Sequence, residues 1–319
     1  MSKNLRIVFY GTPEIAAIEL EYLVNQGYNI VGVVTNVDKP MGRGKKIAFS
    51  PVKEMALQLG VKNILQPASM KSEDFLAELS ALKPDLQVVV AFRMMPKSVY
   101  ALPPLGTFNL HTSLLPQYRG AAPINWAIIN GEEETGITTF LLNDKIDCGE
   151  ILLQRKIAIK AETDFEELYN EMAEQGKKLV ADTIDLIEKG SFETIVQTEE
   201  ETKPAPKIFK EDTYIDWHKN GNEIVNFIRG LCPIPAAKSI FIDESTEKDY
   251  EFKIFKAVFE KNNANKPIGT LWIENNKVIK VRCNDGVVEL VDLQVSGKKR
   301  MLASELVKGL RINELLNKN

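Results

Sequence analysis

The residues best suited to chemistry lie in the stretch FNLHTSLLPQYRG, residues 108–120. It contains His111, one of only 2 histidines in 319 residues, and Asn109 two positions earlier. Because side chains alternate along a strand, the two should face the same side. There an amide could stabilise a carbonyl oxygen that gathers negative charge, while an imidazole moves protons near neutral pH. From this pair alone, a catalytic site and a histidine satisfied by local hydrogen bonds fit the sequence equally well.

A second polar group, NDKIDCGE at residues 143–150, follows a later apolar run. A carboxylate near an imidazole favours the charged ring and fixes its orientation, and Asp144 or Asp147 could serve. An Asx-type turn is the structural alternative. Spacing alone leaves open whether this loop reaches His111.

Other kinds of site have less support. Gly11-Thr12-Pro13 ends the first apolar run and could offer backbone N–H groups to an anion, but it is not G-x-G-x-x-G and equally fits a plain turn. Ser113 lacks the G-x-S-x-G context of a serine hydrolase. One histidine in this part of the chain and 3 scattered cysteines give no metal-ligand spacing, so no metal site is expected.

Alternating strand and helix patterns must position these side chains. Strands are predicted at 5–10, 29–35, 86–91, 106–111, 136–142 and 150–159, and helices at 14–26, 50–60, 72–82 and 164–190. This order predicts an α/β domain over residues 1–190 with a doubly wound, mostly parallel, Rossmann-like sheet. Ligands bind such sheets beyond the carboxyl ends of the strands, where all three polar groups are expected to lie.

The pattern changes after residue 190. A charge run and a Pro-Ala-Pro within 198–212 are typical of an exposed linker, which we place at 191–206. A helix is predicted at 220–231. Short strand-like segments with turn signals such as Asn284-Asp285-Gly286 follow it, and they predict a small OB-like β-barrel over 207–319.

Composition agrees with a globular cytoplasmic protein. Hydrophobic residues make up 44% and charged residues 26%, and no apolar run is long enough to span a membrane. The odd number of scattered cysteines favours a reduced compartment. Net charge is −4, with +3 in residues 207–319 and −7 in residues 1–206, which supports RNA binding only slightly.

Together these residues resemble the 10-formyltetrahydrofolate-dependent formyltransferase family. The histidine is followed by Ser-Leu-Leu-Pro, with Asn two positions before it and Asp-x-Gly 36 positions after it, and this combination is specific. The segments FYGTPEIAA, VVTNVDKPMGRGKK, SPVKEMA, IDW, GTL and SGKKRM are similar to the members of this family that act on methionyl-tRNA.

The resemblance implies catalytic roles for three residues. Asn109 would hydrogen-bond the formyl oxygen, His111 would transfer protons, and Asp147 would orient and tune His111. The pocket for the 10-formyltetrahydrofolate donor would be formed by Arg93, Met94, Met95, Ser113, Leu114, Leu115, Pro116, Leu142 and Asp144. At Phe92-Arg93-Met94 the chain departs from the aromatic-Gly-Leu sequence that is more common in the family.

The resemblance also implies a partner, initiator methionyl-tRNA, bound by a protein that we expect to be monomeric. Two basic segments would contact it: KPMGRGKK, which we expect to be a flexible loop, and SGKKR in the barrel. The predicted contacts are Lys39, Arg43, Lys45, Lys46, Lys298, Lys299 and Arg300. Solvated surface loops are the structural alternative.

Three rival functions remain at this stage. A glycinamide-ribonucleotide or amino-sugar formyltransferase would share the chemistry but would not need the two basic segments. A non-catalytic RNA-binding protein would be expected to lose at least one of Asn109, His111 and Asp147. A dinucleotide-dependent oxidoreductase is disfavoured by the missing glycine fingerprint.

Overall fold

The computed structural model describes residues 4–41, 46–198, 202–262, 264–309 and 314–318. Its internal contacts divide the chain into two compact units. Unit 1 comprises residues 1–120, 134–158 and 169–205, and unit 2 comprises 121–133, 159–168 and 206–319. The two short segments 121–133 and 159–168 therefore belong with the C-terminal part of the chain.

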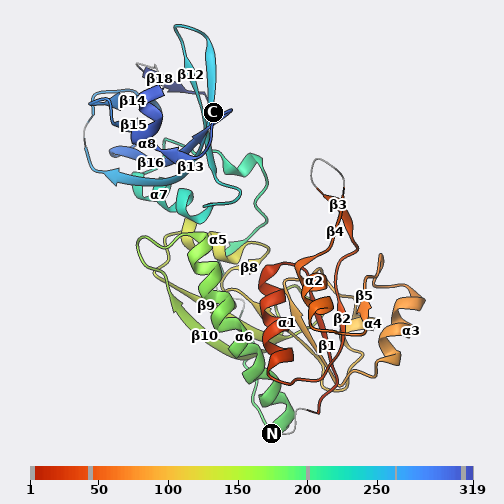
Figure 1. The fold of residues 1–319 in the computed structure, drawn as a ribbon. Helices are drawn as coiled ribbons and strands as arrows, with labels where there is room; N and C mark the ends of the chain where they lie inside the picture. Colours follow the sequence, from red (N-terminus) through yellow and green to blue (C-terminus); the bar gives the residue numbers. More distant parts are fainter. Residues whose placement is uncertain (1–3, 42–45, 199–201, 263, 310–313, 319) are drawn as a thin grey trace. The chain divides into compact units, whose positions relative to one another are not determined.

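Unit 1 is built on a seven-stranded sheet with the order β10-β9-β7-β6-β1-β2-β5 (Figure 1). The strands are β1 (Ile7–Gly11), β2 (Ile30–Val34), β5 (Ile64–Leu65), β6 (Leu86–Val90), β7 (Thr107–His111), β9 (Glu134–Leu141) and β10 (Ile151–Ala158). The first five pair in parallel, whereas β9 runs antiparallel to β7 and β10 antiparallel to β9. The predicted mostly parallel α/β sheet is confirmed.

Alternation along the strands separates two helical layers. Leu110 of β7 points toward α6 (Phe165–Lys189). The absence of a side chain at Gly176 of α6 leaves room for Leu110 and for Glu19 of α1 (Glu14–Asn25). On the other face Tyr10 and Val89 pack against α3 (Glu73–Ala81) and α4 (Lys97–Tyr100). Asn109 lies opposite Val89 in the sheet register and therefore shares this second face.

The helix at 50–60 begins as its capping residues predict. The Ser50 hydroxyl accepts a hydrogen bond from the Lys53 N–H at 3.1 Å, and Pro51 takes the first position of α2 (Pro51–Gln58). The expected flexible loop at 39–46 needs a correction, because its ends form an antiparallel ladder of β3 (Lys39–Met41) and β4 (Lys46–Ala48). Three-residue strands are too short to show an alternating pattern in the sequence.

Unit 2 contains the predicted small barrel. Its strands are β12 (Ala237–Asp243), β13 (Lys248–Glu260), β14 (Thr270–Glu274), β15 (Val278–Arg282), β16 (Val287–Val295) and β18 (Glu314–Asn317). They form a closed antiparallel ring, because β13 pairs with both β12 and β16. Trp217, Phe241 and Phe252 lie fully buried in its core. The barrel class is confirmed, although the sequence patterns did not reveal β18.

The remaining elements of unit 2 surround this barrel. They are α5 (Pro123–Ile129), η1 (Glu211–Thr213), α7 (Gly221–Gly230), β17 (Met301–Leu302), α8 (Ala303–Leu306) and η2 (Val307–Gly309). At the start of α7 the Glu223 carboxylate accepts the Asn220 N–H at 3.2 Å, which completes the helix N-terminus. In unit 1, β8 (Arg119–Gly120) pairs with β11 (Pro204–Ala205). No helix in the described ranges is long and apolar enough to cross a membrane.

Candidate active site

Strand β7 carries Asn109 and His111 to the face of the sheet that α4 covers. On the same face the Thr107 hydroxyl donates to the Tyr100 carbonyl at 2.6 Å, which fixes this side of the strand against α4. Leu110 points to the opposite face, so the alternation expected from the sequence holds here. His111 ends the strand beside Thr138 of β9.

The His111 ring is held mainly by backbone. Its Nε2 lies 2.9 Å from the Tyr118 carbonyl oxygen, and because a carbonyl only accepts, Nε2 carries a hydrogen. Nδ1 then faces the Asp147 carboxylate, with Oδ2 at 3.9 Å. That distance suits an ion pair with a charged ring and exceeds a hydrogen bond. The histidine is 6% exposed and lies edge-on to Phe140.

Asp147 reaches His111 by a route that the sequence did not predict. Since β9 runs antiparallel, the loop after it starts at the amino end of β7, where the Leu142 N–H donates to the Thr107 carbonyl at 2.8 Å. Asp144 then accepts the Tyr100 hydroxyl at 2.5 Å, and Asp147 lies beside His111. The loop therefore runs back along the face of β7. The expectation that residues 143–150 lie beyond the carboxyl ends of the parallel strands is therefore wrong, because the loop starts at their amino ends.

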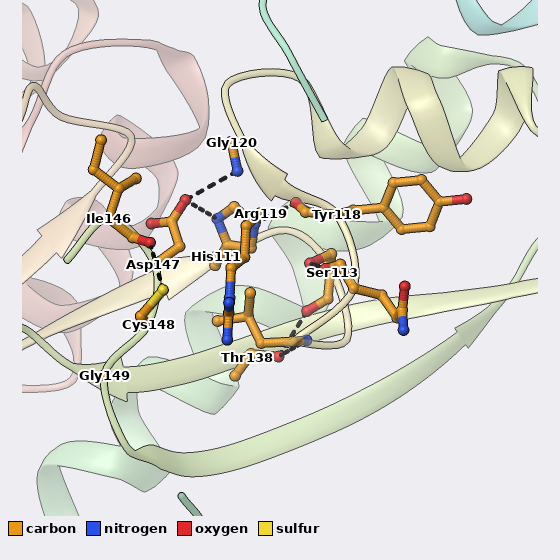
Figure 2. Close-up of polar contacts among 12 residues, drawn as sticks. His111, Ser113, Tyr118, Arg119, Gly120, Thr138, Ile146, Asp147, Cys148 and Gly149 are labelled. Carbon is orange, nitrogen blue, oxygen red and sulfur yellow. Dashed lines mark hydrogen bonds and ion pairs between the residues drawn. The ribbon is translucent and has the colours of Figure 1, made fainter. Parts of the chain in front are cut away.

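Two backbone features allow this loop conformation (Figure 2). Asp147 has φ +52°, and its Oδ2 accepts the Gly120 N–H at 3.1 Å, so the carboxylate lies between that amide and the ring. A Cβ at Gly149 would lie 1.5 Å from the Leu141 carbonyl oxygen. Only glycine permits this approach of the loop to the end of β9.

Gln197 ties the loop to Arg119 of β8. Its Nε2 donates to the carbonyls of Asp147 at 3.0 Å and Gly149 at 2.7 Å. Its Oε1 accepts both Nε and Nη2 of Arg119, at 3.1 and 2.7 Å. One side chain thus links the segments on both sides of the His111–Asp147 pair.

Asn109 is the unpaired polar group of the site. Its Oδ1 is buried and, within the described part of the chain, has no hydrogen-bond partner. An unsatisfied buried amide oxygen costs about 1–3 kcal/mol, so such groups are rare unless a hydrogen-bond donor of a ligand completes them. The Asn109 side chain lies on the face along which the 142–149 loop passes, between Thr107 and His111.

The predicted donor-pocket residues fall into two groups. Met94 is 75% exposed, Asp144 is exposed, and Arg93 is exposed with its Nη2 donating to the Pro67 carbonyl at 2.5 Å. The other six are buried or half-buried: Met95, Ser113, Leu114, Leu115, Pro116 and Leu142. In particular, the buried Ser113 hydroxyl donates to the Gln117 carbonyl at 2.6 Å, which leaves its hydrogen engaged.

The predicted RNA contacts lie in two regions. Arg43 and Lys45 lie outside the described residues, as do the side chains of Lys39 and Lys46, whose backbone forms β3 and β4. Between β16 and β17, Lys298, Lys299 and Arg300 are all exposed. Arg300, however, donates twice to Asp292 Oδ2, at 2.7 and 3.0 Å, and stacks on Phe255 at 4.0 Å. Most of its charge is therefore compensated.

Sequence reasoning missed Tyr118, Gly120 and Gln197. The first two act through backbone atoms, which leave no signal in side-chain type. Gln197 lies in a segment without helical or strand periodicity, and only its tertiary contacts reveal it. Among the described residues no group of three or more His, Cys, Asp or Glu side chains could hold a metal ion.

Two family models match the chain along its length. The model described as Formyl transferase matches residues 5–184, and the model described as Formyl transferase, C-terminal domain, matches residues 207–311. The chain belongs to the formyl transferase family.

Its similarity within this family is specific. It is 47% identical over 313 residues to methionyl-tRNA formyltransferase of Flavobacterium johnsoniae, with 98% of each chain covered. It is 46% identical over 318 residues to methionyl-tRNA formyltransferase of Bacteroides thetaiotaomicron, again with 98% of each covered. The chain is thus placed among the methionyl-tRNA formyltransferases.

A solved structure shares the fold at lower identity. WlaRD, a sugar 3N-formyl transferase solved in the presence of dTDP and 5-N-formyl-THF, aligns with a TM-score of 0.64 and 20% identity. The alignment covers 92% of this chain and 99% of that one. At this identity the likeness concerns the fold alone.

Proposed function

We propose that the protein transfers the formyl group of 10-formyltetrahydrofolate to the α-amino group of methionyl-initiator tRNA, for translation initiation. The observation that carries this proposal is the convergence of Asn109, His111 and Asp147 on one face of the sheet. The choice of acceptor rests on end-to-end similarity to enzymes named for methionyl-tRNA.

The proposed reaction is a direct acyl transfer. The neutral α-amine attacks the formyl carbon, and the carbonyl oxygen becomes an oxyanion in a tetrahedral intermediate. The carbon–nitrogen bond to the folate then breaks, the amine nitrogen gives up a proton, and the departing folate nitrogen gains one. An α-amine has a reference pKa of about 7.7–8.0, so a sizeable neutral fraction exists at pH 7 without a strong base. These steps require neither a metal ion nor a covalent enzyme intermediate.

In this mechanism Asn109 stabilises the oxyanion and His111 transfers protons. The donor would be Nδ2 of Asn109, since an amide oxygen only accepts, and its contact with the developing oxyanion is of a type that usually contributes several kcal/mol to the transition state. With Nε2 already donating to the Tyr118 carbonyl, Nδ1 is the nitrogen of His111 that gains and releases a proton. Asp147 stabilises the charged ring from 3.9 Å, whereas the Tyr118 carbonyl sets the ring's orientation.

Gln197 is a positioning residue in this proposal. Its two donated hydrogen bonds hold the backbone on both sides of Cys148, and so they hold Asp147 near His111. It touches neither substrate nor the reacting atoms. Its contribution is the fixed geometry that general acid–base chemistry needs.

The formyl donor would be bound as a substrate by the predicted pocket. The exposed positions Arg93, Met94 and Asp144 are available to a pterin ring through backbone or side chain. The buried members, such as Leu115, which packs against Phe140, would hold the 142–149 loop in place by hydrophobic contacts. We further infer a monomer in the cytoplasm, where the three cysteines, which are all free, would stay reduced.

The test is formyl transfer from labelled 10-formyltetrahydrofolate to methionyl-initiator tRNA. Methionyl-elongator tRNA, glycinamide ribonucleotide and an amino sugar serve as parallel acceptors. We expect transfer to the initiator, abolished by His111→Ala and weakened by Arg43→Ala. Thermal unfolding of both variants controls for folding.

Two other results would overturn parts of the proposal. Transfer to a small amine alone would keep the formyl transfer chemistry and remove the tRNA assignment. Retained tRNA binding without transfer to any acceptor would support a non-catalytic RNA-binding protein.

A further inference from the structure

A network of polar side chains lies at the base of the β3–β4 ladder in unit 1. Asp38 immediately precedes β3 and Phe49 immediately follows β4, so these two residues flank the ladder. Lys53 of α2 contacts both of them, because its Nζ donates to Asp38 Oδ2 at 2.5 Å and lies 4.1 Å from the centroid of the Phe49 ring. One ammonium group therefore joins the segment that enters the ladder to the segment that leaves it.

Gln66, which follows β5, links the same network to the sheet. Its Oε1 accepts a second hydrogen bond from Lys53 Nζ, at 2.7 Å. Its Nε2 donates to Asp38 Oδ1 at 2.8 Å and to the Asn36 carbonyl at 2.7 Å. Both carboxylate oxygens of Asp38 are thus hydrogen-bonded, and these bonds, first of all the one from Lys53, lower the pKa of Asp38. The carboxylate is therefore charged at neutral pH, and the ion pair is intact there.

The Lys53 side chain is not needed to begin its own helix. The Ser50 hydroxyl caps α2 by accepting the backbone N–H of Lys53, and it shares a hydrogen bond with the Thr35 hydroxyl at 2.7 Å. Neither contact uses the ammonium. A cation in the first turn of a helix is unfavourable, because the helix dipole is positive at that end. The position of Lys53 is therefore explained by its contacts with Asp38, Gln66 and Phe49, and not by α2.

The β3–β4 ladder depends on contacts at its base. Each strand has three residues, and the pair forms a sheet of its own that extends away from the seven-stranded sheet (Figure 1). An isolated two-stranded ladder is only marginally stable in water. Its direction must therefore be set by the segments that flank it, and Lys53 is a side chain that touches both.

We propose that Lys53 is a positioning residue for RNA binding: through Asp38 and Phe49 it fixes the direction in which β3 and β4 leave the sheet. The identity of the RNA rests on the proposed function, in which the basic segment 39–46 contacts methionyl-tRNA. Lys53 itself does not contact the RNA, since its side chain is 15% exposed and its charge is compensated by Asp38. A ladder that is held before binding reduces the ordering cost that binding must otherwise meet.

The test replaces Lys53 by methionine, which removes the ammonium and keeps most of the length of the side chain. We expect Lys53→Met to raise the KM for methionyl-tRNA roughly tenfold, with kcat and the KM for 10-formyltetrahydrofolate unchanged. Lys62→Met is the matched control, because Lys62 is an exposed lysine between α2 and β5. It should leave all three constants at their wild-type values. Lys53→Arg retains a cation that can pair with Asp38 and should recover most of the affinity.

The salt dependence of tRNA binding separates positioning from direct contact. A lysine that neutralises a phosphate contributes about 1 to the slope of log K against log salt concentration. Lys53→Met should therefore raise the dissociation constant of methionyl-tRNA at every KCl concentration without changing the slope. A slope reduced by about 1 would show that Lys53 binds the RNA itself, and it would overturn the positioning role.

Asp38 tests whether the two residues act as a unit. If Lys53 acts through Asp38, the double variant Asp38→Asn/Lys53→Met should bind methionyl-tRNA about as well as Lys53→Met alone. Fully additive losses would contradict this coupling. Thermal unfolding of each variant provides the structural readout. A lower unfolding temperature with wild-type tRNA constants, or an equal loss of affinity for tRNA and folate, would make Lys53 a residue of general stability and would overturn the proposal.

Failure of the proposed function gives a different result. If the wild-type protein transfers no formyl group but binds methionyl-tRNA more tightly than Lys53→Met does, with equal salt slopes, the proposed function is wrong and the positioning role stands. If the wild-type protein formylates methionyl-tRNA and Lys53→Met does so with the same KM, the proposed function stands and the positioning role is wrong.

Discussion

Asn109 is the residue at which the chemistry can be tested with least disturbance to the fold. Its buried Oδ1 has no partner among the described residues, so shortening the side chain removes no hydrogen bond recorded in the free protein. Asn109 could be identified from the sequence because it lies two positions before His111 in a predicted strand, where alternation places both side chains on one face. The lack of a partner was not visible, since it depends on everything that surrounds the strand.

We predict that Asn109→Ala lowers kcat by roughly 10²–10³, the usual cost of removing one oxyanion donor. The free energy of unfolding should change little. Asn109→Asp keeps the shape but replaces the amide with a carboxylate, and it should be at least as inactive. Single-turnover formyl transfer and chemical denaturation provide the measurements, and full activity in either variant would contradict the role.

Gln197 tests whether the catalytic loop must be held. Gln197→Ala should lower kcat by about tenfold with little change in the KM for methionyl-tRNA, because the loop that carries Asp147 is displaced. Gln197→Glu keeps an acceptor for Arg119 but places a carboxylate oxygen against the carbonyls of Asp147 and Gly149.

The Glu variant therefore separates the two functions of Gln197. If holding the loop matters, it should be as impaired as Gln197→Ala; wild-type kcat in the Glu variant would show that only the contact with Arg119 counts. Thr194→Ala is the matched control, since Thr194 lies in the same segment and donates to Glu150 instead.

At the level of elements, the packing of α1 against α6 buries an ionisable group. Glu19 of α1 is fully buried, neither carboxylate oxygen has a partner among the described residues, and burial raises its pKa well above the usual value, against a lowering effect from Lys177. The folded state thus keeps a proton that the unfolded chain releases above its own pKa, about 4.3. The free energy of unfolding is therefore unaffected by Glu19 ionisation below about pH 4.3. It decreases as pH rises from that value toward the folded pKa, because the unfolded chain gains stability by releasing the proton.

We therefore predict that Glu19→Gln becomes more stable relative to wild type as pH increases from 5 to 8. The difference should grow by up to about 1.4 kcal/mol per pH unit within the window between the two pKa values. Urea denaturation at several pH values measures it. Glu21→Gln, an exposed position on the same helix, controls for the loss of charge, and parallel stability curves for Glu19→Gln and wild type would contradict the prediction.

Some helices and strands could be predicted from the sequence, whereas the direction of one strand could not. Five consecutive buried residues make β6 easy to recognise, and Ser50 with Pro51 marks the start of α2. The reversal of β9 could not be predicted, because the direction of a strand depends on which edge it joins and not on its own residues. That reversal alone determines how Asp147 approaches His111.

For the whole molecule, charge is divided along the chain. Residues 207–319 carry +3 and residues 1–206 carry −7, so an acidic catalytic unit is joined to a basic barrel. We predict that the KM for methionyl-tRNA rises steeply with salt. Three phosphate contacts would give roughly a 40-fold increase between 50 and 200 mM KCl.

The KM for the folate donor should change far less over the same range, because a small ligand releases few counterions. Steady-state kinetics with each substrate varied in turn would measure both effects. An equal salt dependence for the two substrates would argue against a backbone-dominated interaction with the RNA.

The backward course of residues 142–149 along β7 has one more consequence. The histidine belongs to the sheet, whereas the carboxylate belongs to a connection that the sheet does not pair, held by Gln197 and by the amide of Gly120. Breaking these few part-buried hydrogen bonds costs less free energy than disrupting a central strand. We therefore expect any local opening of this connection to separate the Asp147 carboxylate from the ring, while His111 keeps its place in the sheet.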